Sequence, residues 1–145
     1  MMQGTLRELL PDGSVRLTSG ESAFVFARPT AGVLVVTIAG YDKGQFGTAA
    51  LDEIGSVLRL GTRVHLFVDA RNAIGATVRV SEDWTGFLSR HQTELAHVHV
   101  LVGSKMVELT VAIARHLSRT DRLIQSYSDP AIFEAQLEAA CKRRP

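Results

Sequence analysis

The chain has 145 residues, a length that suits one domain with a sizeable core. Its hydrophobic content of 46% and charged content of 21% exclude a disordered chain, and no apolar run reaches the roughly 18 residues of a membrane-spanning helix. A net charge of +1 argues against a nucleic-acid-binding protein, and the single cysteine excludes an intramolecular disulfide. The N-terminus shows no signal-peptide pattern, so we expect a cytoplasmic protein.

The first part of the chain predicts antiparallel strands. Three β-prone segments lie at residues 5–10, 14–18 and 23–28. The first two flank the sequence Pro-Asp-Gly at residues 11–13, which is typical of a hairpin turn. We therefore expect an N-terminal β meander over about residues 1–32.

The rest of the chain alternates apolar strands with amphipathic helices. The four strand segments lie at residues 33–38, 64–68, 97–102 and 123–126. This alternation is typical of parallel β-α-β crossovers. We predict a single α/β domain over residues 1–145. Its mixed sheet would begin with antiparallel strands, continue as a βαβαβαβα core over about residues 33–140, and be followed by a short basic tail at 141–145.

Apolar residues at helical spacing predict four main helices, each with one side against the core. Their expected core-facing residues are Phe46, Ala49, Ala50, Ile54, Val57 and Leu58 in the first, Trp84, Phe87, Leu88, His91 and Leu95 in the second, Met106, Leu109, Thr110, Ile113, Ala114 and Leu117 in the third, and Phe133, Gln136, Leu137 and Ala140 in the fourth. Ser81 is the expected N-cap of the second helix. Asp129 and Pro130 are expected to begin the fourth.

Polar residues follow several of the predicted strands, and parallel strands bring their carboxyl ends to one edge of the sheet, where ligands bind. The candidate binding residues there are Tyr41, Asp42, Asp69, Arg71, Asn72, Ser104 and Lys105. Turn and capping roles are the alternative. Asp69 is either a functional carboxylate or a partner of Arg71, and Ser104 is either a plain N-cap or, with Lys105, an anion ligand.

Residues 74–80 are predicted to form a small apolar loop before the second helix. This loop is either a mobile lid over an apolar pocket or a surface that binds a partner, and an ordinary connection is the alternative. In the binding interpretations, Val78, Val80 and Trp84 contact the ligand or the partner.

Metal and catalytic patterns are sparse. His97 and His99 alternate on one strand and point to the same side, but no cysteine or histidine stands nearby with metal-site spacing. We therefore predict no metal site and no cofactor. Because a nucleophile elbow and a cofactor fingerprint are also lacking, we expect a protein that is not an enzyme.

The segments at residues 64–72 and 97–105, with Trp84 between them, resemble the STAS domain, and in particular the SpoIIAA-like (STAS/SEC14-type) family of small bacterial proteins. The resemblance implies a regulatory module that binds a partner protein. In anti-sigma factor antagonists a serine in an Asp-Ser-Ser-Gly motif is phosphorylated. This chain lacks that motif, and the nearest candidate phospho-acceptors are Thr77 and Ser81.

Three functions remain as hypotheses. The leading one is a non-enzymatic regulatory or protein-interaction module, with the partner bound at residues 74–80 and on the following helix. The alternatives are a carrier of a small apolar ligand or lipid, which the SEC14-like resemblance implies, and an enzyme using the strand-end polar cluster. Self-association as a homodimer is a further hypothesis, in which Phe24, Phe26 and Tyr41 pair across a two-fold axis. The alternative is that the two phenylalanines cover the sheet.

Overall fold

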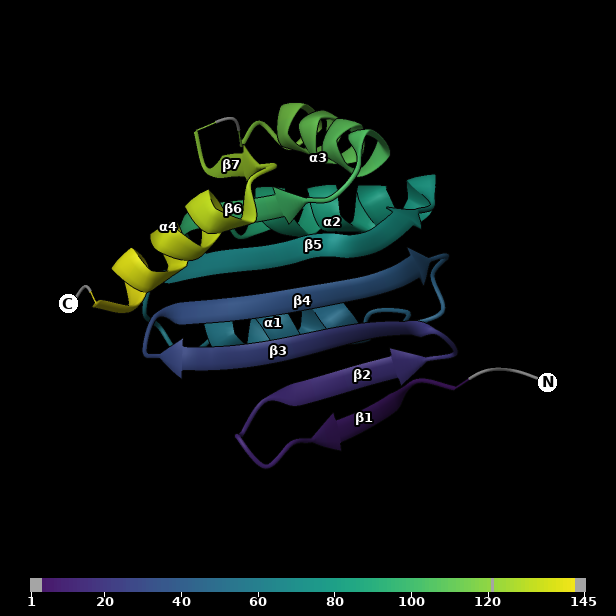
Figure 1. The fold of residues 1–145 in the computed structure, drawn as a ribbon, viewed down its shortest axis with the longest axis horizontal. Coiled ribbons are helices and arrows are strands. Elements are labelled where there is room, and N and C mark those ends of the chain that lie inside the picture. Colours follow the sequence, from purple (N-terminus) through teal and green to yellow (C-terminus); the bar gives the residue numbers. More distant parts are fainter. Residues whose placement is uncertain (1–3, 121, 143–145) are drawn as a thin grey trace.

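The computed structural model describes residues 4–120 and 122–142, and these form a seven-stranded mixed sheet with four helices (Figure 1). The strands are β1 (Leu6–Leu9), β2 (Val15–Ser19), β3 (Ser22–Thr30), β4 (Val33–Asp42), β5 (Val64–Ala76), β6 (Leu95–Val102) and β7 (Ile124–Tyr127). The helices are α1 (Ala49–Leu58), α2 (Val78–Arg90), α3 (Lys105–Leu117) and α4 (Pro130–Lys142). The strand order in the sheet follows the chain from β1 to β7. The predicted α/β fold is confirmed.

Strands β1 to β4 form the antiparallel part of the sheet. The first hairpin turns where predicted, since Asp12 Oδ1 accepts a hydrogen bond from the Ser14 backbone N–H at 3.0 Å. Phe24 and Phe26 are buried in the core, with their rings stacked at a centroid distance of 6.0 Å. These two rings therefore cover the sheet, and the hypothesis that they pair with a second copy was wrong.

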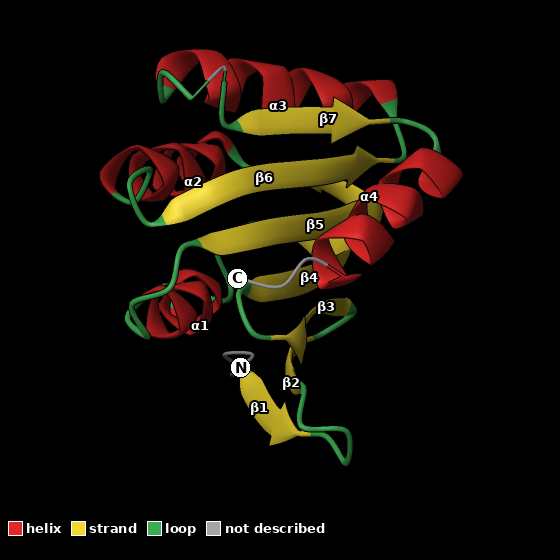
Figure 2. Cartoon of the chain, turned by 90° about the vertical axis from the view of Figure 1, so that its left-hand side faces the viewer, coloured by secondary structure: helices red, strands yellow, loops and turns green. Residues whose placement is uncertain are grey.

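Strands β4 to β7 are parallel, and helices cover both of their faces. Helices α1, α2 and α3 lie on one side of the sheet, and α4 lies alone on the other (Figure 2). Leu66 and Val68 of β5 pack into the larger core with α1 and α2, whereas Phe67 between them packs against Phe133 of α4. The alternation of side chains along β5 thus divides the hydrophobic interior into two cores.

The predicted loop over residues 74–80 does not exist. Strand β5 continues to Ala76, because Gly75 and Ala76 pair with Tyr41 and Asp42 of β4. Helix α2 then begins at Val78 and its N-cap is Thr77, whose Oγ1 accepts a hydrogen bond from the Val80 backbone N–H at 3.3 Å. The prediction of Ser81 as the N-cap was wrong by one helical turn.

Helix α1 also begins later than its apolar pattern predicts. It starts at Ala49, and Phe46 lies in the preceding turn. The Phe46 ring is nevertheless buried, and it meets the Phe24 ring edge-on at 4.8 Å between centroids. Phe46 therefore belongs to the core without belonging to the helix.

Helix α3 turns to the sheet a side that overlaps only in part with the predicted one, since Thr110 and Ala114 lie toward the sheet as expected. Met106, Leu109, Ile113 and Leu117, which we expected in the core, have exposed fractions of 69%, 61%, 50% and 64%. Val107 is buried instead, and Val111 packs beside it. Successive residues of a helix are about 100° apart around its axis. The side that faces the sheet is therefore rotated from the predicted side by about one residue.

Candidate functional site

A small apolar cavity lies between α2, α3 and the sheet. Its volume is about 140 Å³, and its floor is made by β5 and β6 side chains such as Val68 and Val100. Trp84 of α2 lines one side, and Val111 and Ala114 of α3 line another. This volume suits one aromatic ring or a short branched hydrocarbon, and a dry apolar cavity of similar size is known to bind benzene.

Three polar side chains stand among the apolar residues that line this cavity. They are Asp42 at the end of β4, Ser81 on α2 and Thr110 on α3. Burial raises the pKa of the Asp42 carboxyl above its usual range, with a smaller contribution from Asp83, while a hydrogen bond from the Gly44 backbone N–H at 2.9 Å opposes the shift. The cavity therefore combines apolar walls with a carboxyl group that holds its proton more tightly than usual.

Two predicted binding residues of α2 differ in what they can contact. Val80 is buried and lines the cavity, so it belongs to the wall. Val78, two residues earlier, is 75% exposed and faces solvent. A charged substitution at Val80 would place an unpaired charge in the core, so only Val78 can serve to test a surface interaction.

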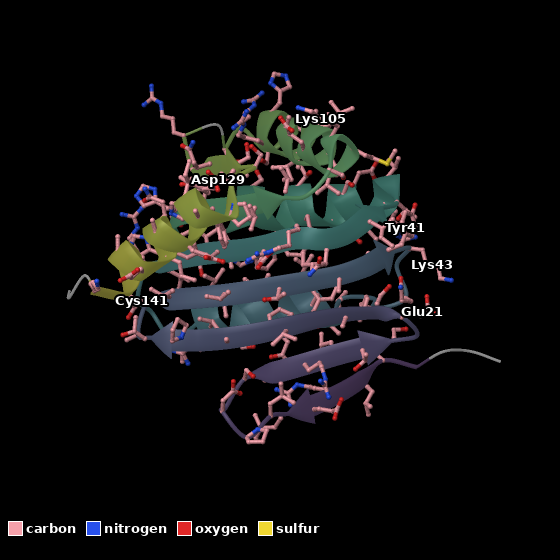
Figure 3. The ribbon with its side chains drawn as sticks, viewed as in Figure 1. Glu21, Tyr41, Lys43, Lys105, Asp129 and Cys141 are labelled. Atoms are coloured by element: carbon pink, nitrogen blue, oxygen red, sulfur yellow. The ribbon has the colours of Figure 1, made fainter. Side chains whose placement is uncertain are left out.

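The remaining strand-end residues do not gather into one cluster. Tyr41 and Lys43 lie at the end of β4, whereas Lys105 lies on α3 (Figure 3). Lys105 is 96% exposed in its side chain and its ammonium lies 3.6 Å from Glu108. Ser104 is the N-cap of α3 and accepts a hydrogen bond from the Val107 backbone N–H at 3.2 Å. Of the two interpretations of Ser104, the capping role is the one the structure shows.

Gly103 explains how the chain leaves β6 for α3. A Cβ atom at this position would lie 2.2 Å from the backbone oxygen of Arg71 on the neighbouring strand. Only glycine allows the two backbones to approach this closely. The position therefore has a packing role beside Ser104 and Lys105.

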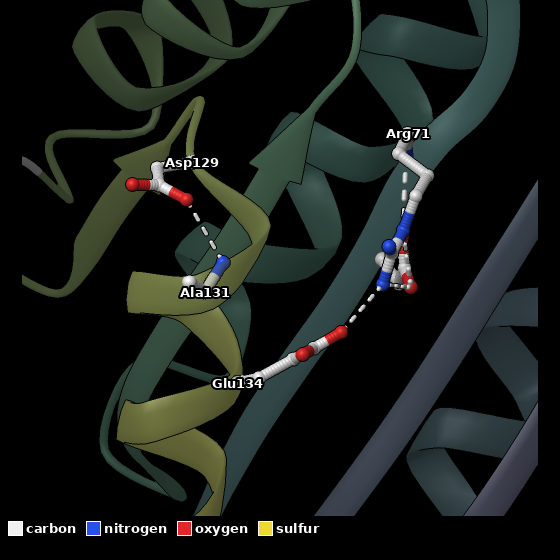
Figure 4. A network of polar contacts seen from close by, with 5 residues as sticks. Arg71, Asp129, Ala131 and Glu134 are labelled. Atoms are coloured by element: carbon white, nitrogen blue, oxygen red, sulfur yellow. Dashed lines mark hydrogen bonds and ion pairs between the residues drawn. The ribbon is translucent and has the colours of Figure 1, made fainter.

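Arg71, which reaches toward Glu134 of α4 (Figure 4), also forms an ion pair with Asp69 on the α4 side of the sheet. Arg71 Nη2 lies 2.9 Å from Asp69 Oδ2 and 3.2 Å from Glu134 Oε1 of α4. The two carboxylates raise the pKa of the guanidinium above its usual value. Of the two roles considered for Asp69, pairing with Arg71 is therefore observed. Asn72 is exposed farther along β5.

The start of α4 agrees with its sequence. Asp129 Oδ1 accepts a hydrogen bond from the Ala131 backbone N–H at 2.9 Å, and Pro130 is the first residue of the helix (Figure 4). Cys141 lies inside α4 and packs against the smaller core. Of the predicted basic tail, Arg143, Arg144 and Pro145 lie outside the described residues.

A row of three histidines crosses two strands on the α4 side. The parallel register places His65 of β5 beside His97 of β6, with ring centroids 5.4 Å apart, and His99 follows at 5.9 Å from His97. His99 Nδ1 is 2.8 Å from the hydroxyl of Tyr127, whose pKa burial raises. The sequence alone does not identify His65 as a member of this row, since only the register between β5 and β6 places it beside His97.

The described residues, 4–120 and 122–142, contain no group of three or more histidine, cysteine, aspartate or glutamate side chains that could hold a metal ion. None of their helices is long and apolar enough to cross a membrane.

Comparison with known proteins shows what this fold is similar to. No family model and no curated protein matches the chain. An uncharacterised DUF3478-family protein with a SpoIIAA-like fold from Shewanella loihica PV-4 is 14% identical with a TM-score of 0.60, over 83% of this chain and 98% of that one. The unphosphorylated anti-sigma factor antagonist SpoIIAA is 12% identical with a TM-score of 0.57, over 84% and 99%. The chain therefore has a SpoIIAA-like fold.

Proposed function

We propose that this chain, with its SpoIIAA-like fold, is a non-enzymatic regulatory module that binds a partner protein on the outward side of α3. The observation that carries the proposal is the α3 stripe, which we define as Met106, Leu109, Ile113 and Leu117, all at least half exposed. A helix on the surface of a globular protein normally turns its apolar stripe to the core. Exposed apolar patches mark interaction sites.

The spacing and charge of the stripe suggest what the partner presents. Its residues follow at intervals of three and four, the pattern by which one side of a helix enters an apolar groove. The exposed basic residues His116 and Arg119 lie at the C-terminal end of α3. We therefore expect a partner whose apolar groove has acidic side chains at the end that meets this part of the helix.

A phosphorylation switch remains a proposal, and the two candidate acceptors are not equivalent. Thr77 stands at the N-terminus of α2, where backbone N–H groups and the helix dipole stabilise a phosphate. Ser81 lines the cavity and donates a hydrogen bond from its Oγ to the Thr77 carbonyl oxygen at 3.2 Å. A phosphate on Ser81 would have to open the cavity, so Thr77 is the better acceptor.

The experiment is quantitative affinity purification from the native host with three proteins in parallel. They are the unaltered chain, a Leu109→Asp/Ile113→Asp variant, and the control Ile132→Asp. Ile132 is 52% exposed on α4, across the sheet from α3, so its substitution adds a carboxylate at an exposed apolar position without touching the stripe. Mass spectrometry would identify both the partners and any phosphate on Thr77.

The expected result is a stoichiometric partner that the control retains and the stripe variant loses. A partner retained equally by all three proteins would contradict the use of the α3 stripe. Light scattering on the same samples would detect a homodimer, and its loss only in the stripe variant would make a second copy of the chain the partner. Fractionation of the host cells would test the expected cytoplasmic location.

A second candidate function is the binding of a small apolar ligand, and the cavity beside Trp84 supports it. At about 140 Å³ it is smaller than the roughly 300–1,000 Å³ of ordinary ligand pockets. A whole lipid therefore does not fit, although a ring or a short acyl segment does. The third hypothesis, an enzyme, loses its main support because Asp69 is held by Arg71, away from the cavity.

Trp84 is the only tryptophan of the chain and lines the cavity, so its fluorescence reports directly on occupancy. Titration with benzene-sized probes should shift the emission of the unaltered protein. An Ala114→Leu variant, in which leucine fills the cavity, should not respond. Equal responses from both proteins would count against a ligand in this cavity, as would the absence of any apolar compound in an organic extract of the purified protein.

A further inference from the structure

We propose that a groove at the N-terminal ends of β5, β6 and β7 binds anions that carry phosphate groups. This basic groove has two parts that share Arg122 and Leu123. One part, of about 420 Å³, is lined by Arg63 and Arg119. The other, of about 510 Å³, contains the histidine row and lies against α4. The groove shares Arg119 with the basic end of the proposed partner surface, but no residue of the α3 stripe or of the apolar cavity lines it, so an anion site goes beyond the proposed function.

Three arginines come to the groove from different connections. Arg63 directly precedes β5, Arg119 follows α3, and Arg122 precedes β7. All three are exposed, and Arg63 also donates a hydrogen bond from Nη2 to the Leu95 carbonyl oxygen at 3.3 Å. Guanidinium groups remain charged at every physiological pH and bind phosphate oxygens through two parallel N–H groups.

The histidine row lines the second part of the groove. The groups that face it are Tyr127 and Gln125 of β7, Arg122 before β7, and Gln136 of α4. Among the described lining residues of both parts there is no aspartate or glutamate. In the sequence, Asp121 separates Arg119 from Arg122.

Arg119 occupies a backbone position that favours glycine. Its φ is 58°, and the end of α3 has the hydrogen bonds of a Schellman motif, from the Thr120 N–H to the Arg115 oxygen at 3.1 Å and from the Arg119 N–H to the His116 oxygen at 3.2 Å. A long side chain at this position works against the stability of the turn. What the Arg119 side chain contributes is a positive charge in the groove.

Because Arg119 costs stability and supplies charge, replacing it should change both properties in a single variant. Arg119→Gly should raise the thermal midpoint of unfolding, because glycine adopts the positive φ without strain, and should also weaken anion binding. A purely structural role of Arg119 cannot give both results. Arg122→Gln should weaken binding without the gain in stability. The control Arg16→Gln removes an arginine of β2 that pairs with Glu8 of β1, far from the groove.

The test is isothermal titration calorimetry of the full chain with inorganic pyrophosphate at low ionic strength, with sulfate for comparison. We expect binding to weaken by about fivefold or more in Arg119→Gly and Arg122→Gln, as the loss of one charge-assisted contact implies, and to be unchanged in Arg16→Gln.

A second arm distinguishes the source of the phosphate. Vesicles of phosphatidylglycerol in phosphatidylcholine would replace pyrophosphate in a sedimentation assay with the same variants. Binding to pyrophosphate that the groove variants lose supports a soluble ligand. Binding only to vesicles, with the same loss, supports a lipid headgroup. Neither binding, or binding that Arg119→Gly and Arg122→Gln leave unchanged, would overturn the proposal.

Discussion

Helices α3 and α4 have the same length and lie on opposite sides of the sheet, and they differ in which side they turn toward it. The apolar pattern of α3 is the more regular, yet its four large apolar side chains, Met106, Leu109, Ile113 and Leu117, face solvent. The pattern of α4 is weaker, yet Phe133 is buried and meets Phe67 edge-on at 5.7 Å between centroids. Periodicity therefore identifies the apolar side of a helix but not what covers that side.

The largest effect should come from removing the anchor of α4. Phe133→Ala deletes a fully buried ring from the smaller core and should lower the free energy of unfolding by about 3–5 kcal/mol. Urea unfolding followed by circular dichroism would measure the loss. Ile132→Ala, at an exposed neighbouring position, should cost less than about 1 kcal/mol. Equal small losses would show that α4 is not held by its apolar side.

The next effect concerns the space beneath α3. Ala114→Leu adds apolar volume to the cavity and should raise the free energy of unfolding by about 1 kcal/mol, once the ordering of the longer side chain is subtracted from its burial. The same substitution at the exposed Ala135 of α4 should change it by less than about 0.5 kcal/mol. A marked loss of stability in Ala114→Leu would mean that α3 packs more tightly than the cavity indicates.

Asp42 should make stability depend on pH in a defined direction. Its pKa is raised in the folded state, so the folded chain binds the proton more readily, and stability falls as the pH rises through that pKa. Asp42→Asn keeps an acceptor for the Gly44 N–H and should raise the free energy of unfolding at pH 7 by up to about 1 kcal/mol, with no gain at pH 3.

Asp12 provides the opposite case for the same measurement. Hydrogen bonds from the Ser14 hydroxyl and backbone N–H lower the pKa of its carboxyl. Its contribution to stability is therefore present at neutral pH and is lost as the pH falls through the lowered pKa. Asp12→Asn should decrease stability at pH 7, where Asp42→Asn increases it. Urea unfolding at pH 7 would measure both changes. If the two substitutions changed the free energy of unfolding in the same direction, Asp12 and Asp42 would not have opposite environments.

The smallest effect should come from the α3 stripe. Leu109→Gln and Ile113→Gln replace exposed apolar side chains with residues that also favour helix, so the free energy of unfolding should change by less than about 0.5 kcal/mol for each. Val107→Gln on the same helix buries an amide and should cost several times more. If the stripe variants unfold as readily as Val107→Gln, the stripe is part of the core after all.

The sequence predicted the features that depend on neighbours along the chain. The strand pattern, the hairpin turn at Asp12 and the N-cap at Asp129 are local, and the structure confirms them. The side of α3 that meets the sheet, the pairing of Gly75 with β4 and the contact of His65 with His97 depend on packing and on register between strands. A single sequence contains no signal for these relations.

The same limit applies to the candidate site. Asp42, Val80, Ser81 and Trp84 do meet around one cavity, whereas Asp69 and Arg71 lie across the sheet from it. Successive strand residues point to opposite sides, so nearness at a strand end does not mean nearness of the side chains. Thr77 and Ser81 are both good capping residues and lie one helical turn apart. Thr77 is the N-cap because β5 ends directly before it, at Ala76.

The strand order has a consequence for how the chain is made. Every strand from β2 to β7 has its immediate predecessor in the chain as a sheet neighbour. As the polypeptide leaves the ribosome, each new strand finds that neighbour already synthesised, and no strand has to insert between two others. The sheet can therefore grow in one direction as a template that lengthens with the nascent chain, and the buried β4–β5 pair can form before β6 and β7 exist.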